Sequence, residues 1–304
     1  MIVRPRLHWL RMLFVLRGSV LLEIAPQLLV TTGLAVLVTM AHGQVYHWKI
    51  PLNFVPFSLI GLTLAIFLGF RNSTSYARWW EARALWGVLL NETRNLLRQA
   101  LTLDPGAARH APALARRLIA FIHALRHQLR GSDASADLAR LLPAADCERL
   151  ATARWKPALL MLMAGEWLGE RVRDGGLPPA LAQAMEVPLA KLTEALGGCE
   201  RIAGTPIPFT YSVIIHRTIY LYCLLLPFGL VDSIDAMTPV VVALIAYTFF
   251  ALEALSAEIE EPFGREPNDL ALDAMSRTIE GTLREMMGEA PENDVPPTSD
   301  YLVT

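Results

Sequence analysis

Two long runs without a formal charge limit what this chain can fold into. Residues 24–48 are 25 residues without Asp, Glu, Lys or Arg, and residues 50–70 are another 21. A helix needs about 20 apolar residues to cross the hydrocarbon core of a bilayer. Both runs meet that length, so we predict two membrane-spanning helices. A secretory signal peptide would have a shorter apolar core, of about 7 to 15 residues, so we favour a retained first span.

Two shorter uncharged runs predict a second pair of spans. Residues 236–252 number 17, and this run reaches spanning length if Glu253 lies at the membrane edge. Residues 218–231 number 14, and His216 and Arg217 separate them from further apolar residues on their N-terminal side. In a spanning helix these two side chains would face protein or extend toward the lipid headgroups.

The composition agrees with a membrane protein. Hydrophobic residues make up 53% of the chain and charged residues 18%, whereas about 25% is usual in soluble domains. The 27 Lys and Arg nearly balance the 29 Asp and Glu, which leaves no basic excess for a nucleic-acid partner. The common nucleotide, acyl-transfer and zinc-protease motifs are absent from the sequence, and its three cysteines lack metal spacing. We therefore expect no enzymatic activity, cofactor or metal.

The positions of the arginines predict the orientation. Four precede the first span and five follow the second between Arg71 and Arg98, and arginines close to a span are retained on the cytoplasmic side. Both termini are then cytoplasmic. In chain order we expect a cytosolic segment 1–23, two spans in 24–70, a cytosolic helical insertion 71–208, two spans in 209–257, a cytosolic helical region 258–287 and an extended or disordered tail 288–304.

The insertion has apolar residues at helical spacing, interrupted by clusters of turn-forming residues. These predicted turns are residues 104–106, 131–133 and 175–179. His123 and His127, four residues apart, could bind a metal from one helix face. Arg126 and Arg130 lie beside them, so we interpret this face as a solvated or partner-facing edge.

The second uncharged run carries two patterns on different helix faces. A small-residue face, which lets another membrane helix approach closely, consists of Gly61, Ala65 and Gly69. An apolar stripe about 100° further around the helix consists of Leu62, Ile66 and Phe70. In a symmetric ring of subunits, packing of the small-residue face against a neighbour could turn the stripe toward the axis. The same four-residue spacing is also typical of residues that face lipid or pack in a core.

Five segments together resemble the bestrophin family, in its bacterial branch. They are FLGFRNSTSYARWWEAR (67–83), CERIAGTPIP (199–208), LPF (226–228), EIEEPFG (258–264) and NDL (268–270). The resemblance implies an all-α membrane protein of the bacterial inner membrane. It implies a homopentameric ion channel with four membrane helices per subunit, a large helical cytosolic region and one axial pore. The expected partners are further copies of the chain, the lipid bilayer and monovalent ions, with cations favoured.

The resemblance also assigns residues. Three apolar residues on the second membrane helix line the narrow neck of such pores, and the matching positions are those of the apolar stripe. A second constriction at the cytosolic exit is expected at Leu177, with Leu181 as the alternative. Animal members bind calcium in an acidic run that here retains Glu266 and Asp269. Arg265 adds a positive charge where calcium requires oxygen ligands, so we expect no calcium gating.

Three other functions stay open. An anion channel of the same fold is the first. A secondary transporter is the second, because ionisable residues in or near spans often mark ion relays: Glu23, His216, Arg217 and Glu253. Positions of the two glutamates at the membrane interfaces would explain them equally well. A membrane-anchored scaffold with a partner-binding insertion is the third.

Overall fold

The computed structural model describes the chain except residues 3–7, 17, 46–47, 50–53, 291–302 and 304. The secondary-structure elements of the described residues are all helices apart from one short antiparallel pair of strands, β1 (Gln44–Val45) and β2 (Trp48–Lys49). The expected all-α class is therefore confirmed. The chain forms two compact units: unit 1 contains residues 1–3, 80–205 and 262–304, and unit 2 contains residues 4–79 and 206–261.

Unit 2 is built from the apolar segments. Its elements are α1 (Trp9–Met12), α2 (Leu21–Met40), the first part of α3 (Phe54–Leu103), α9 (Phe209–Ile234), the 3-10 turn η1 (Asp235–Met237) and α10 (Thr238–Glu260). Helix α2 packs against α9 and α10, which also pack against each other. Their shared core includes the buried side chains of Phe57, Leu68, Tyr222 and Phe250.

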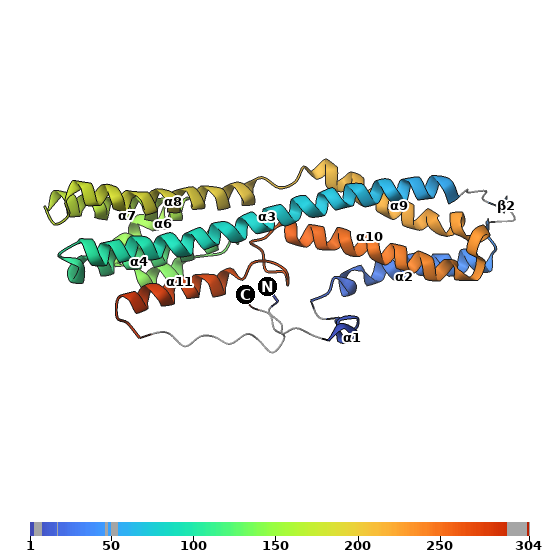
Figure 1. Cartoon of the computed structure of the whole chain (residues 1–304), viewed down its shortest axis with the longest axis horizontal. Coiled ribbons are helices and arrows are strands. Elements are labelled where there is room, and N and C mark those ends of the chain that lie inside the picture. Colours follow the sequence, from blue (N-terminus) through green and yellow to red (C-terminus); the bar gives the residue numbers. More distant parts are fainter. Residues whose placement is uncertain (3–7, 17, 46–47, 50–53, 291–302, 304) are drawn as a thin grey trace. The chain divides into compact units, whose positions relative to one another are not determined.

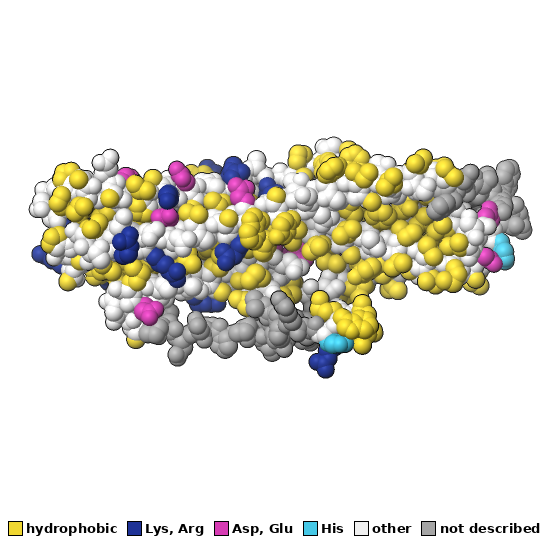
Figure 2. All heavy atoms as spheres, viewed as in Figure 1, with side chains coloured by type: hydrophobic (Ala, Val, Ile, Leu, Met, Phe, Trp, Pro, Cys, Tyr) yellow, Lys and Arg dark blue, Asp and Glu magenta, His cyan; other side chains and the backbone are white. Residues whose placement is uncertain are grey.

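Three helical segments among the described residues are long and apolar enough to cross a membrane. They are Leu21–Met40, Val55–Leu103 and Phe209–Glu260. The last contains α9 and α10, which fold back on each other at η1 (Figure 1). At 1.5 Å per residue these two helices are about 39 and 35 Å long, so each has spanning length. Mostly hydrophobic side chains cover the visible face of α9, α10 and the first part of α3 (Figure 2).

The first uncharged run is only partly helical. Helix α2 ends at Met40, although the run continues to Trp48. His42 and Gly43 follow with φ values of 48° and 72°. Such left-handed residues commonly terminate a helix, and here they lead into β1.

Helix α3 continues far beyond the second uncharged run. Its 50 residues extend over about 75 Å, and it passes without a break through Arg71, where the sequence placed the end of a span. No proline lies between Pro56 and Pro105, so nothing in this stretch forces the helix to end. It ends at Leu103, at the first predicted turn, and the other two predicted turns also separate helices.

Unit 1 is built around one central helix, α4. Besides the second part of α3 it contains α4 (Ala107–Leu129), α5 (Ser135–Leu141), α6 (Ala144–Ala151), α7 (Lys156–Arg173), α8 (Pro179–Gly204) and α11 (Leu272–Met286). Helix α4 packs against α5, α7, α8 and α11, and its buried residues include Leu114, Leu118 and Phe121. Most of the predicted tail, residues 288–304, lies outside the described residues.

Candidate functional site

The apolar stripe lies on the side of α3 that points away from the core of unit 2. Leu62, Ile66 and Phe70 are 60%, 50% and 63% exposed. Leu64 and Leu68, each about 160° around the helix from Ile66, are 4% and 0% exposed. The stripe is therefore not used for packing within unit 2. Its large apolar side chains are free to contact lipid, another copy of the chain, or a central axis.

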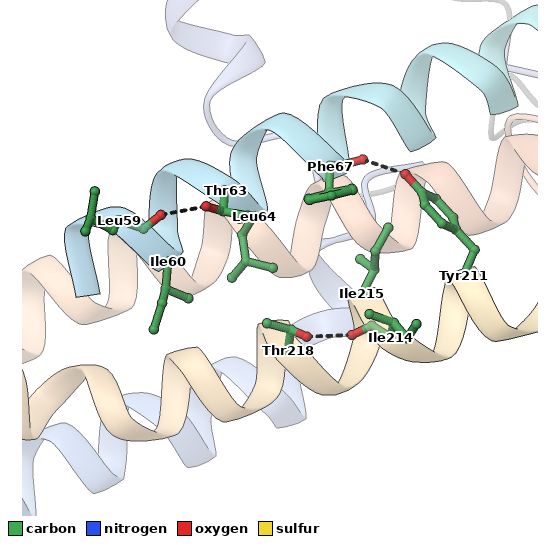
Figure 3. A pocket seen from close by; sticks show the side chains of 9 residues that line it. All are labelled: Leu59, Ile60, Thr63, Leu64, Phe67, Tyr211, Ile214, Ile215 and Thr218. Atoms are coloured by element: carbon green, nitrogen blue, oxygen red, sulfur yellow. Dashed lines mark hydrogen bonds between the residues drawn. The ribbon is translucent and has the colours of Figure 1, made fainter. Parts of the chain in front are cut away.

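An apolar groove of about 550 Å³ runs beside the stripe between α3 and α9. Ile60 and Leu64 extend from α3 toward α9, and Ile215 extends from α9 toward α3 (Figure 3). Among the residues lining the groove, the hydroxyl of Tyr211 donates to the carbonyl oxygen of Phe67 at 3.3 Å. None of the lining residues carries a charge, so the groove offers only apolar contacts and satisfied hydroxyls.

The small-residue face is divided between two environments. A Cβ atom at Gly61 would lie 2.7 Å from the hydroxyl oxygen of Tyr222 on α9, so Gly61 permits close packing inside the same subunit. Ala65 and Gly69 are exposed, and a Cβ atom at Gly69 would meet nothing within 4 Å. The sequence assigned all three residues to contact with a neighbouring copy. The structure shows that Gly61 packs within its own chain, whereas a contact of Ala65 and Gly69 with a neighbouring copy stays a prediction.

A charged cluster in unit 2 begins at Arg71, one residue after the stripe. The Arg71 side chain is 5% exposed, and its Nη1 lies 3.8 Å from Glu253 Oε1 while its Nη2 lies 3.4 Å from Glu260 Oε2. His216 Nδ1 is 2.9 Å from the same Glu253 oxygen. The sequence placed Glu253 and His216 near membrane edges but did not connect them with Arg71. The available signal for Arg71 was its position in the sequence, as the first charged residue after the second uncharged run.

A second charged cluster is buried in unit 1. His123 is 2% exposed, and its Nε2 lies 2.6 Å from Glu280 Oε2. Arg140 donates to both carboxylate oxygens of Glu280, at 2.6 and 3.0 Å, and Arg284 Nη2 lies 2.6 Å from Glu280 Oε1. Burial raises the pKa of Glu280, but hydrogen bonds from His123 and Arg140 outweigh it and hold this pKa well below its usual range.

The interpretation of this face as a solvated or partner-facing edge was wrong for His123, which is 2% exposed. His123 lies inside unit 1, and the His127 side chain is 17% exposed, with its Nε2 3.0 Å from Asp137 Oδ2. The main partner of His123 is Glu280, which is 157 residues away in the chain. Local spacing carries no information about such a distant partner.

The residue predicted to form the cytosolic constriction is buried in its own unit. Leu177 is 1% exposed, and its backbone N–H donates to the Arg171 carbonyl oxygen at 3.0 Å. A constriction requires a side chain that faces the axis, which argues against Leu177. The alternative, Leu181, lies in the first turn of α8 and is half-buried, and its role in a constriction stays a prediction.

The two acidic residues considered for calcium lie between α10 and α11. Asp269 is 2% exposed, and its Oδ2 accepts the backbone N–H of Glu266 at 2.7 Å. The side chain of Glu266 is exposed. The part of the chain that the structure describes contains no group of three His, Cys, Asp or Glu suited to a metal ion.

Comparisons by sequence and by structure find relatives in the same protein family. The family model for bacterial/fungal bestrophin proteins matches residues 1–285. A protein of Ralstonia nicotianae named a voltage-dependent anion channel-forming protein is 50% identical over 97% of both chains. One from Escherichia coli K12 with the same descriptive name is 44% identical over 95% of both chains.

A solved structure agrees with these relatives. The crystal structure of a bacterial bestrophin homologue from Klebsiella pneumoniae superposes with a TM-score of 0.86 at 41% identity, and the match covers 88% of this chain and 100% of that one. The names of the two sequence relatives specify anions. They therefore do not support the preference for monovalent cations that was expected from the sequence.

Proposed function

The chain belongs to the bacterial/fungal bestrophin family, and from this membership we propose that it is an ion channel for passive flow. The proposed assembly is a homopentamer around one axial pore in the bacterial inner membrane. In each subunit α2, the first part of α3, α9 and α10 span the bilayer, with both termini in the cytoplasm. Residues 71–208 and 258–287 form the proposed cytosolic region. The names of the relatives favour anions as the permeant ions.

The observation that carries the pore is the exposure of the apolar stripe. Successive members of Leu62, Ile66 and Phe70 are four residues apart, which is a rise of about 6 Å along α3. In a symmetric assembly with this face toward the axis, they form three stacked apolar rings. A narrow apolar ring excludes water and so blocks ions, because removing an ion's hydration is energetically expensive. The rings would therefore act as the neck of the pore.

The sign of the permeant ion is tested by reversal potentials in planar bilayers that contain the purified protein. With KCl at different concentrations on the two sides, we expect the reversal potential to move toward the chloride equilibrium potential. Replacing potassium by sodium should then leave it unchanged, whereas replacing chloride by a large organic anion should shift it. A shift toward the potassium equilibrium potential would reject anions as the permeant ions. It would still support the proposal that the chain forms a channel.

The same recordings separate the channel from its rivals. A protein that conducts nothing at all would instead be a membrane-anchored scaffold. A saturating, proton-coupled flux without single-channel steps would identify a transporter, for which the cluster of Arg71, His216 and Glu253 would be the first candidate relay.

The two glycines at the ends of the small-residue face should respond differently to the same substitution. We expect Gly61→Leu to lower the thermal unfolding temperature of the subunit, because overpacking against Tyr222 typically costs about 1 to 3 kcal/mol. Gly69→Leu should keep the fold but reduce the mass of the particle in detergent, because it holds neighbouring helices apart. Light scattering with a parallel melting curve measures both. If the Gly69→Leu particle has the same mass as the wild type, Gly69 is not part of the contact between subunits.

Calcium should not open the channel. Glu266 is exposed, Asp269 is engaged by the backbone N–H of Glu266, and Arg265 is positively charged, whereas calcium requires six to eight oxygen ligands. We expect the same current in chelator and in micromolar free calcium. A steep calcium dependence that survives Glu266→Gln would show that other oxygens form a site.

A further inference from the structure

A polar pocket of about 380 Å³ in unit 2 plays no part in the proposed neck. Arg71 of α3, Ser212, His216 and Arg217 of α9, and Glu253 of α10 contribute to its lining. On α9 these residues lie on the face opposite to Ile214 and Ile215, which line the apolar groove. The pocket is therefore an open depression separate from the groove.

The hydrogen-bond donors of Arg71 are not satisfied within this pocket. Its side chain is 5% exposed, and its Nε and Nη1 atoms have no hydrogen-bond partner among the described residues. Leaving a buried charged donor without an acceptor is strongly unfavourable. A ligand with acceptor oxygens in the pocket would provide the missing partners.

Each carboxylate beside Arg71 also contacts another donor. Glu253 Oε1 lies 2.9 Å from His216 Nδ1 and 3.8 Å from Arg71 Nη1. Glu260 lies 3.4 Å from Arg71 Nη2 through its Oε2 and accepts the backbone N–H of Ile207 at 3.2 Å through its Oε1. A guanidinium group has only donors, and the Nε and Nη1 atoms of Arg71 lack an acceptor in the described part of the chain. These unused donors favour an anionic ligand over a cation.

A second positive charge and a helix terminus add to the donors of Arg71. Arg217 lines the same pocket, is exposed and makes no ion pair with any residue that the structure describes. Helix α9 begins at Phe209, also in the pocket lining, and the first turn of a helix carries unsatisfied N–H groups and a partial positive charge. Guanidinium groups and helix N-termini are the groups that proteins commonly use to bind phosphate.

We infer that this pocket binds a phosphate group, presented by an anionic lipid headgroup or by a soluble phosphate. Arg71 is the first charged residue after the second uncharged run, so it lies where a spanning helix would leave the hydrocarbon core. Lipid phosphates lie at that depth, and basic pockets between membrane helices commonly hold such headgroups. The position therefore favours the lipid source. The inference does not depend on which residues line the pore.

The test is calorimetric titration of the full chain in detergent, with dihexanoyl phosphatidylglycerol and, separately, with inorganic phosphate. Arg217→Gln should weaken binding of the phosphatidylglycerol about tenfold, which is about 1.4 kcal/mol. Arg71→Lys keeps a positive charge beside Glu253 and Glu260 but removes Nε as a donor, and it should also weaken binding. The matched control is Arg11→Gln, which makes the same charge change at an exposed residue of α1 outside the pocket and should leave the affinity unchanged.

The two titrations distinguish the sources. Phosphatidylglycerol binding that depends on Arg217 and Arg71, with inorganic phosphate bound much more weakly, supports a lipid headgroup. Inorganic phosphate binding with the same dependence, and no added affinity for phosphatidylglycerol, supports a soluble phosphate. The inference is overturned if neither ligand binds, or if Arg217→Gln, Arg71→Lys and Arg11→Gln all bind like the wild type.

Discussion

Replacing Ile66 with alanine is expected to raise the single-channel conductance or the open probability about tenfold or more. Ile66 is the middle member of the apolar stripe and is 50% exposed on the side of α3 away from the core of unit 2. Shortening its side chain widens the proposed central ring and admits water, which lowers the barrier to a hydrated ion. Each 1.4 kcal/mol removed from that barrier increases the rate about tenfold. Single-channel recording in a planar bilayer measures the effect.

The matched control for this experiment is Ile60→Ala. Ile60 is the same residue type on the same helix and is 42% exposed, but it lies about 120° around α3 from Ile66 and lines the apolar groove. It should leave the conductance and open probability close to those of the wild type. Equal effects of Ile60→Ala and Ile66→Ala would show that the stripe does not line the pore.

Replacing Glu280 with alanine should destabilise unit 1 by about 3 to 5 kcal/mol. The substitution leaves His123, Arg140 and Arg284 without their shared carboxylate, and breaking a buried ion pair from one side is strongly destabilising. Hydrogen exchange of the amides in α4 and α11 measures this local stability. The control is Glu166→Ala, which removes an exposed carboxylate that binds Arg149 at 2.6 and 2.7 Å and should cost less than about 1 kcal/mol. Similar losses of stability in the two variants would show that burial of the cluster adds nothing to the stability of unit 1.

The pH dependence of unit 1 follows from the same carboxylate. The folded-state pKa of Glu280 is lowered, so its contribution to stability is complete above the unfolded-state value of about 4.3. That contribution is lost as the pH falls below this value toward the folded-state pKa. Hydrogen-exchange protection in α4 should therefore decline in acid, and Glu280→Gln should reduce the steepness of the decline. An identical pH profile in Glu280→Gln would exclude Glu280 as the cause.

Charge runs and turn residues predicted the helices well because they act locally. Helix α3 ends at a turn that contains Asp104 and Pro105, as its sequence indicates. The same rules placed a boundary at Arg71, but a charge marks the edge of a membrane and does not end a helix. A charge run predicts the depth of a residue in the bilayer, and only glycine, proline and capping residues predict where the helix stops.

The errors concern contacts between segments that are distant in sequence. Gly61 and Gly69 belong to the same four-residue repeat, yet only at Gly61 would a Cβ atom meet Tyr222 of α9. His123 was misplaced because its partner, Glu280, lies on α11. Leu177 follows a pair of glycines that indicate a surface turn, but its side chain is buried in unit 1. For Gly61 and His123 the deciding neighbour comes from another helix, and one sequence without its three-dimensional partners does not identify it.

The pairing of His123 with Glu280 also has a consequence for biosynthesis. These two residues are 157 positions apart, so at 5 to 20 residues per second a ribosome needs roughly 8 to 30 s to add the second after the first. Throughout that interval α4 has been made but α11, which packs against it, has not. A nascent chain that stalls before Leu272 therefore lacks the helix that covers this side of α4. Its His123 and Arg140 are left with Asp137 as their one remaining carboxylate partner among the described residues.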